Sequence, residues 1–140
     1  MKHKTILLVE DDYLDVTSVK RGLKKFNIDY TLHVAHNGVD ALAILNGNSP
    51  DGTKVLPDII LLDLNMPKMN GLEFLRIIKN YYSLNSIKIF IMTTSSEEYD
   101  KIAAQKLEVT GYILKPLNFD NYSKKESCLD TLNLMTELMK

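Results

Sequence analysis

Acidic, cationic and hydroxyl side chains stand at the ends of several short apolar runs in this sequence. If these runs are parallel strands of one sheet, their carboxyl ends share one edge, and the side chains that follow them converge there. The side chains are Glu10 and Asp11 after Ile6–Val9, Asp63 after Ile59–Leu62, Thr93 at the end of Ile87–Thr93, and Lys115 after Gly111–Leu114.

Such a group of residues suits phosphoryl chemistry. Three carboxylates at one edge repel each other and raise their own pKa values unless a cation lies among them. Oxygen ligands without histidine or cysteine favour a hard cation, Mg²⁺ before Ca²⁺. A carboxylate beside Mg²⁺ can attack a phosphoryl group, and the Lys115 ammonium and Thr93 hydroxyl would then compensate the charge on the phosphoryl oxygens.

Each of these residues also has an ordinary interpretation when taken alone. Asp63 would be a turn aspartate at a strand end, Thr93 a β-forming residue and Lys115 a solvated turn residue. Asp12 would be the N-cap of the helix that follows it. The phosphoryl interpretation depends on finding all the parts at the ends of successive strands.

The elements that must position these residues alternate between strand and helix. Five apolar runs predict strands, and four stretches with helical spacing separate them, so a parallel sheet covered by helices on both faces is expected. A last helix from about Asn118 is predicted to place Met135 and Met139 on its apolar side. The predicted strands are 6–9, 30–35, 59–62, 87–93 and 111–114, and the internal helices begin near residues 13, 37, 70 and 95.

Local signals fix several helix ends. Asn37 is expected to cap the second helix, which should end at Asn46-Gly47. Asn70 with Glu73 and Ser95 with Glu98 are typical of helix starts. The connection from Asn46 to Pro57 is longer than the roughly two to six residues that are usual before a strand.

Composition limits the protein class. The 140 residues suit a single domain, and 17 basic against 18 acidic residues favour neither a nucleic-acid surface nor a membrane-binding patch. No apolar run approaches the length of a membrane span, and no signal peptide is recognisable. Cys128 is the sole cysteine and the three histidines lack ligand spacing, so we expect a cytoplasmic protein without a disulfide or a cysteine metal site.

From about Lys4 to Met139 the chain resembles the receiver domains of two-component response regulators. The matching motifs are Val9-Glu10-Asp11-Asp12, Leu62-Asp63-Leu64-Asn65-Met66-Pro67 with Gly71, Met92-Thr93-Thr94, and Tyr112-Ile113-Leu114-Lys115-Pro116. The resemblance implies a flavodoxin-like fold, with a five-stranded parallel sheet in the order 2-1-3-4-5 and five helices.

The resemblance also implies roles for individual residues. Asp63 would accept a phosphoryl group from a histidine kinase or a histidine phosphotransfer protein. Asp11 and Asp63 would bind Mg²⁺ directly, together with the backbone carbonyl of Asn65, and Glu10 through water. Thr93 and Lys115 would stabilise the phosphoryl group, Thr93 and Tyr112 would form a switch pair, and the Lys115–Pro116 bond would be cis.

The long 46–57 connection makes the chain similar to stand-alone regulators that are paired with phytochrome-type kinases. We expect residues 1–140 to be a single receiver domain without an output domain. Output would then be a contact with a downstream protein, through a surface that phosphorylation changes, or with a second copy in a homodimer. The protein would be a signalling phosphoacceptor and not an enzyme on other substrates.

Three other functions remain open on the residues. A haloacid-dehalogenase-type phosphatase also forms an aspartyl phosphate, but it needs an acid two residues after the nucleophile, where this chain has Asn65. A flavodoxin needs a phosphate loop rich in Ser, Thr and Gly after the first strand, where this chain has three acids. A receiver that binds partners without phosphorylation is the third.

Overall fold

The structure is a computed structural model that describes residues 3–26, 28–64, 69, 71–81, 87–93, 109–115 and 128–140. Five parallel strands form one sheet in the order β2-β1-β3-β4-β5, as the flavodoxin-like fold requires. The strands are β1 (Lys4–Val9), β2 (Tyr30–Ala35), β3 (Ile59–Asp63), β4 (Lys88–Thr93) and β5 (Gly111–Leu114).

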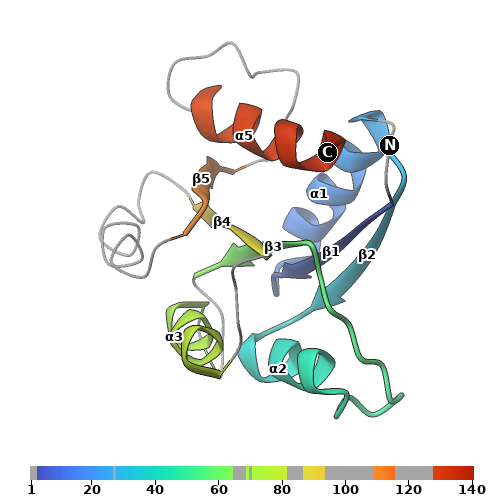
Figure 1. Cartoon of the computed structure of the whole chain (residues 1–140), viewed down its shortest axis with the longest axis vertical. Coiled ribbons are helices and arrows are strands. Elements are labelled where there is room, and N and C mark those ends of the chain that lie inside the picture. The colour runs from blue at the N-terminus through green and yellow to red at the C-terminus, as the bar shows by residue number, and fades with distance from the viewer. Residues whose placement is uncertain are drawn as a thin grey trace.

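Helices lie on both faces of this sheet (Figure 1). The helices α1 (Tyr13–Phe26) and α5 (Cys128–Met139) lie on one face, and α2 (Gly38–Asn46) and α3 (Gly71–Tyr81) lie on the other. The described residues therefore contain four of the five expected helices. The expected helix after Ser95 falls at 94–108, which lies outside the described residues.

The core is divided into two hydrophobic clusters because successive side chains of a strand point to opposite faces. In β3, Ile59 and Leu61 belong to the cluster under α1 and α5, whereas Ile60 and Leu62 belong to the cluster under α2 and α3. All four side chains are at most 2% exposed. Burial on both faces explains why the sequence of β3 is continuously apolar.

The ends of α2 follow the sequence signals. The Asn37 side chain accepts a hydrogen bond from the Asp40 backbone N–H at 2.8 Å, which is an N-cap. Gly47 ends the helix in the left-handed conformation, with φ of 77°. These two predictions are confirmed.

The long connection after α2 is folded back onto that helix. The Val55 backbone N–H donates to the Ile44 carbonyl at 3.1 Å, and the Val55 side chain is buried in the α2–α3 cluster. The Ser49 hydroxyl bonds the Asp51 carboxylate at 2.8 Å. The extra residues of this connection therefore place a buried Val55 and a hydrogen-bonded turn against the face of the sheet that α2 covers.

One packing prediction for α5 is wrong. Met135 is half-buried against the core as expected, but Met139 is 56% exposed. Among the α5 side chains that the structure describes, from residue 133 on, Leu134 and Leu138 are completely buried, one turn apart. The expected start of this helix near Asn118 falls at 116–127 and lies outside the described residues.

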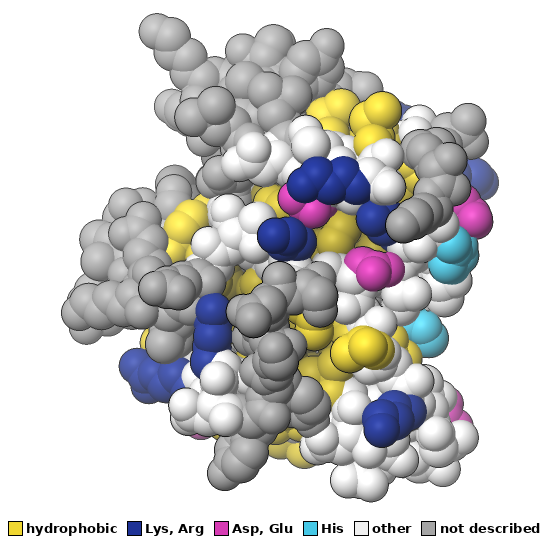
Figure 2. All heavy atoms as spheres, in the orientation of Figure 1, with side chains coloured by type: hydrophobic (Ala, Val, Ile, Leu, Met, Phe, Trp, Pro, Cys, Tyr) yellow, Lys and Arg dark blue, Asp and Glu magenta, His cyan; other side chains and the backbone are white. Residues whose placement is uncertain are grey.

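On the face shown in Figure 2, basic and acidic side chains lie next to one another, with hydrophobic side chains visible between them. This mixture agrees with the near-zero net charge of the chain. Among the described residues, the structure has no helix with the length and hydrophobicity that crossing a lipid bilayer requires.

Candidate functional site

The strand register brings the expected site residues to one edge of the sheet. Val9 of β1 pairs with Leu62 of β3, so Glu10 and Asp63 are the next residues on two adjacent strands. Asp63 pairs with Met92 of β4, and the next residue, Thr93, pairs with Leu114 of β5, directly before Lys115. The predicted convergence of the strand ends is confirmed for the backbone.

Three carboxylates meet at this edge. Oxygen atoms of Glu10, Asp11 and Asp63 lie within 4.8 Å of one another, close enough to share a metal ion. Glu10 is fully buried and Asp63 is 3% exposed, whereas Asp11 is exposed. The side chains of Glu10 and Asp63 are thus buried, and that of Asp11 faces solvent.

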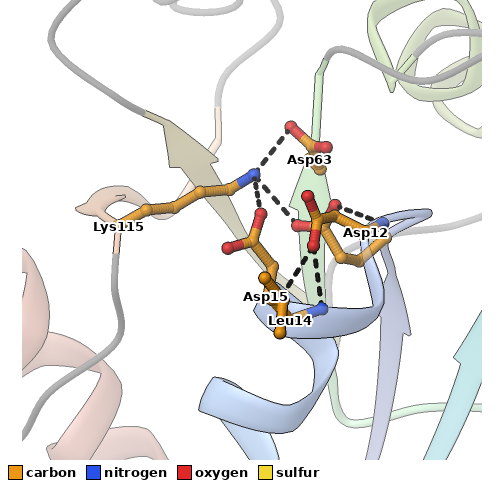
Figure 3. A network of polar contacts seen from close by, with 6 residues as sticks. Asp12, Leu14, Asp15, Asp63 and Lys115 are labelled. Atoms are coloured by element: carbon orange, nitrogen blue, oxygen red, sulfur yellow. Dashed lines mark hydrogen bonds and ion pairs between the residues drawn. The ribbon is translucent and has the colours of Figure 1, made fainter.

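Lys115 supplies the positive charge among these acids (Figure 3). Its Nζ lies 3.0 Å from Oε1 of Glu10, 3.0 Å from Oδ2 of Asp15 and 3.4 Å from Oδ1 of Asp63. The lysine side chain is only 10% exposed. A single ammonium group with three N–H donors is therefore shared by three carboxylates.

The first turn of α1 contributes to the same network. Oδ1 of Asp12 accepts the backbone N–H of Leu14 at 2.8 Å and that of Asp15 at 3.2 Å, so Asp12 is the N-cap. The backbone N–H of Asp12 donates to Oε2 of Glu10 at 3.2 Å. The cap thus fixes the loop after β1 against the buried glutamate.

Burial and charge shift two pKa values in opposite ways. Burial, a hydrogen bond with Asp63 and the Asp63 charge raise the pKa of Glu10 to about 8, although Lys115 acts against this shift. Burial alone would lower the pKa of Lys115, but the close carboxylates of Glu10, Asp63 and Asp15 outweigh it and raise that pKa. The lysine is therefore charged throughout the physiological range.

The donor set fits a hard divalent cation. The buried Oε1 atom of Glu10 accepts no hydrogen bond from the described residues, although it lies 3.0 Å from the Lys115 ammonium. Glu10, Asp11 and Asp63 offer only oxygen ligands, and one ammonium does not balance their charges. Oxygen-rich, acidic surroundings of this kind suit Mg²⁺, Mn²⁺ or Ca²⁺.

Gly71 provides the close approach that α3 needs beside the site. A Cβ atom at Gly71 would clash with the Asp63 carbonyl oxygen and would lie 2.7 Å from Cα of Leu64. The Gly71 N–H donates to the Leu64 carbonyl at 3.0 Å. The absence of a side chain therefore lets α3 begin directly against the chain that leaves β3.

Several expected residues are placed only in part. Thr93 ends β4, but its side chain lies outside what the structure describes, as do Asn65 and Pro116. Tyr112 is half-buried and packs against the α2–α3 cluster. His33 and His36 line a separate hollow beside α2 and do not join the carboxylates.

The sequence interpretation missed Asp15. In the sequence it is an ordinary acid in the first turn of a helix, where acids are favoured by the helix dipole. Its contact with Lys115 joins residues 100 positions apart. Only its place on the turn that follows the Glu10–Asp11 pair could have suggested that it reaches the site.

Comparisons with known proteins agree with this geometry. A family model described as "Response regulator receiver domain" matches residues 6–125. Response regulator Rcp1 from Synechocystis sp. is 37% identical over 133 residues, which cover 95% of this chain and 90% of that protein.

Two solved structures show the same fold. The Mn²⁺-bound form of response regulator Rcp1 has a TM-score of 0.72 at 35% identity, covering 94% of this chain and 88% of that one. The phosphorylated cyanobacterial phytochrome response regulator RcpA has a TM-score of 0.73 at 29% identity, covering 98% and 89%.

Proposed function

Because the chain belongs to the family of response regulator receiver domains, we propose that Asp63 is the residue on which it accepts a phosphoryl group. Receiver domains are phosphoacceptors of two-component signalling, and this chain has that role. The observation that carries the choice of Asp63 is its place at the end of β3, 3% exposed, beside two further carboxylates and Lys115.

The transfer needs a single exchange of bonds at phosphorus. A carboxylate oxygen of Asp63 attacks the phosphorus of a phosphohistidine or a small phosphodonor and forms an O–P bond. The bond from phosphorus to the donor nitrogen or oxygen breaks, and its electron pair leaves with the donor. The Lys115 ammonium, 3.4 Å from Asp63 before transfer, then donates a hydrogen bond to a phosphoryl oxygen. The Thr93 hydroxyl donates to a second oxygen.

A divalent cation, which we take to be Mg²⁺, would be held by this chain's own oxygens. Asp11 and Asp63 would hold it directly, together with the Asn65 backbone carbonyl, and Glu10 would hold it through water. When bound, the ion neutralises charge on the phosphoryl oxygens. The unbalanced acidic charge around Glu10 supports this assignment.

Thr93 and Tyr112 form the switch pair in this proposal. Thr93 moves toward the phosphoryl group, the Tyr112 ring enters the space that is left, and the Lys115–Pro116 bond is cis. The half-buried position of Tyr112 against the α2–α3 cluster supports a side chain that can exchange between two packings.

The surface that changes then binds a downstream protein or a second copy of the chain. Sedimentation with and without beryllofluoride tests the homodimer: two monomeric samples at high concentration would exclude it.

The upstream partner is a histidine kinase or a histidine phosphotransfer protein. The similarity to the phytochrome response regulator RcpA favours a phytochrome-type kinase. We further propose that residues 1–140 act as one receiver domain in the cytoplasm, without an enzymatic reaction on other substrates and without direct binding to nucleic acid or membrane.

The decisive experiment is the intact mass after incubation with acetyl phosphate and Mg²⁺. One added phosphoryl group is expected in the wild type and in Asp12→Asn, which keeps a competent helix cap. Asp63→Asn should stay unmodified. Equal labelling of Asp63→Asn would show that another residue is the acceptor.

A further inference from the structure

Lys115 has more acceptors around it in the unphosphorylated protein than phosphoryl transfer requires. Its three N–H donors face Glu10, Asp15 and Asp63, and the two contacts at 3.0 Å are those to Glu10 and Asp15. Asp63 is the most distant of the three, at 3.4 Å. The ammonium group therefore contacts all three carboxylates but lies closer to Glu10 and Asp15 than to the proposed phosphoacceptor (Figure 3).

The Asp15 carboxylate is available for this contact because its usual helix role is taken by another residue. Asp15 is the third residue of α1, and in a capping box an acid at this position accepts the N–H of the N-cap residue. Here that N–H, on Asp12, donates to Oε2 of Glu10 instead. The Asp15 carboxylate turns to Lys115 and accepts a hydrogen bond at 3.0 Å.

Of the three acceptors, Asp15 gives up the lysine most easily. Its side chain is 30% exposed, against 0% for Glu10 and 4% for Asp63. Water can replace the ammonium at a partly exposed carboxylate, whereas a buried carboxylate would be left without compensation. Of the two contacts at 3.0 Å, the one to Asp15 is therefore the easier to break when the Lys115 ammonium moves toward a phosphoryl oxygen on Asp63.

Building on the proposed function, we propose that Asp15 is a positioning residue that holds the Lys115 ammonium in the unphosphorylated protein and releases it to the phosphoryl group on Asp63. Asp15 forms and breaks no covalent bond. Its contact competes with the phosphoryl oxygen for one hydrogen-bond donor, so it sets how readily the site accepts a phosphoryl group.

The test is the affinity for beryllofluoride, a phosphoryl mimic, measured by calorimetry at saturating Mg²⁺. Asp15→Asn keeps the size of the side chain but holds an ammonium less strongly, so it should bind the mimic about three- to fivefold more tightly, the range of a partly exposed ion pair. Asp15→Glu should return the affinity to the wild-type value. Asp12→Asn is the matched control, because it removes a charge from the same helix turn without contacting Lys115, and it should change the affinity much less.

A double-mutant cycle separates contact from general charge. In a Lys115→Ala background, Asp15→Asn should no longer change the affinity. Unchanged or weaker binding by Asp15→Asn, or an equal gain in Asp12→Asn, would overturn the inference while the proposed function stands. If wild-type protein itself does not bind beryllofluoride, the proposed function fails and the inference with it. If Asp15→Asn does not fold, Asp15→Ser takes its place in every comparison.

Discussion

A carboxylate oxygen of Glu10 and one of Asp63 lie within 4.8 Å of each other at the ends of adjacent strands, and both side chains are almost completely buried. Burial and the charge of Asp63 raise the pKa of Glu10 to about 8. Without a metal ion, Glu10 therefore keeps its proton to a higher pH than an ordinary glutamate does. A cation bound beside Glu10 favours its charged form, so cation binding is coupled to proton release.

Metal binding should release a proton. At pH 7, calorimetric titration with Mg²⁺ in two buffers of different ionisation enthalpy should show net proton release, because the pKa of Glu10 is raised to about 8 in the metal-free site. The apparent affinity should rise with pH and level off above about pH 8. Glu10→Gln should release fewer protons than the wild type, and a wild-type affinity that is independent of pH would contradict the raised pKa of Glu10.

The metal-free protein should lose stability as the pH rises. The folded pKa of Glu10 lies above its ordinary value of 4.5, so the folded state binds more protons between pH 4.5 and 8. The contribution of Glu10 to the free energy of unfolding is thus present at pH 4.5 and decreases toward pH 8. Urea denaturation in a chelator should show this decrease with rising pH in the wild type but not in Glu10→Gln. Parallel pH profiles for the two proteins would refute this.

Removing the charge of Lys115 should destabilise the metal-free fold. Lys115→Met keeps the stem but leaves Glu10 and Asp63 without their shared cation, a change expected to cost about 3 kcal/mol in the free energy of unfolding. Lys140→Met is the matched control, because Lys140 is 61% exposed and pairs only with Glu137 among the described residues, so little change is expected. Saturating Mg²⁺ should recover part of the Lys115→Met loss.

Gly71→Ala should be poorly tolerated. Its Cβ would meet the Asp63 carbonyl oxygen and Cα of Leu64, both backbone atoms that cannot move aside by changing rotamer. We expect a loss of more than about 3 kcal/mol in thermal or urea unfolding, together with slower phosphorylation. Gly52→Ala is the comparison: it has φ of 76° but open space around it, so only about 1 kcal/mol of backbone strain is expected. Equal losses in the two variants would contradict the packing argument.

The sequence predicted the sheet well because its strands are nearly uniform in character. A run such as Ile59–Leu62 is explained only by burial on both faces, and the alternation of strands with helical patterns leaves few topologies. Caps such as Asn37 and Asp12 were also readable, since their hydrogen bonds are local. The first strand begins at Lys4, two residues before its apolar run, because Lys4 and Thr5 pair with β2 through their backbone.

Contacts between distant segments were less predictable. Leu134 and Leu138 are buried and Met139 is exposed because of how α5 is rotated about its axis on the sheet. The sequence does not specify this rotation, because apolar residues occur at several positions around the helix. The Asp15–Lys115 contact depends on where the Asp12 N–H donates, and no local pattern specifies that.

Because side chains alternate along β3, the number of residues before Asp63 decides on which face of the sheet its carboxylate lies. Asp63 is an even number of residues from Ile59 and Leu61, so its carboxylate lies on the α1 side of the sheet, where Lys115 and Asp15 meet it. One residue inserted within β3 would turn that carboxylate toward α2 and α3, whereas one inserted in the 46–57 connection would leave it in place. The length of the surface connection beside α2 can therefore change without moving the Asp63 carboxylate. The number of residues within β3 cannot change, because it decides which face of the sheet that carboxylate lies on.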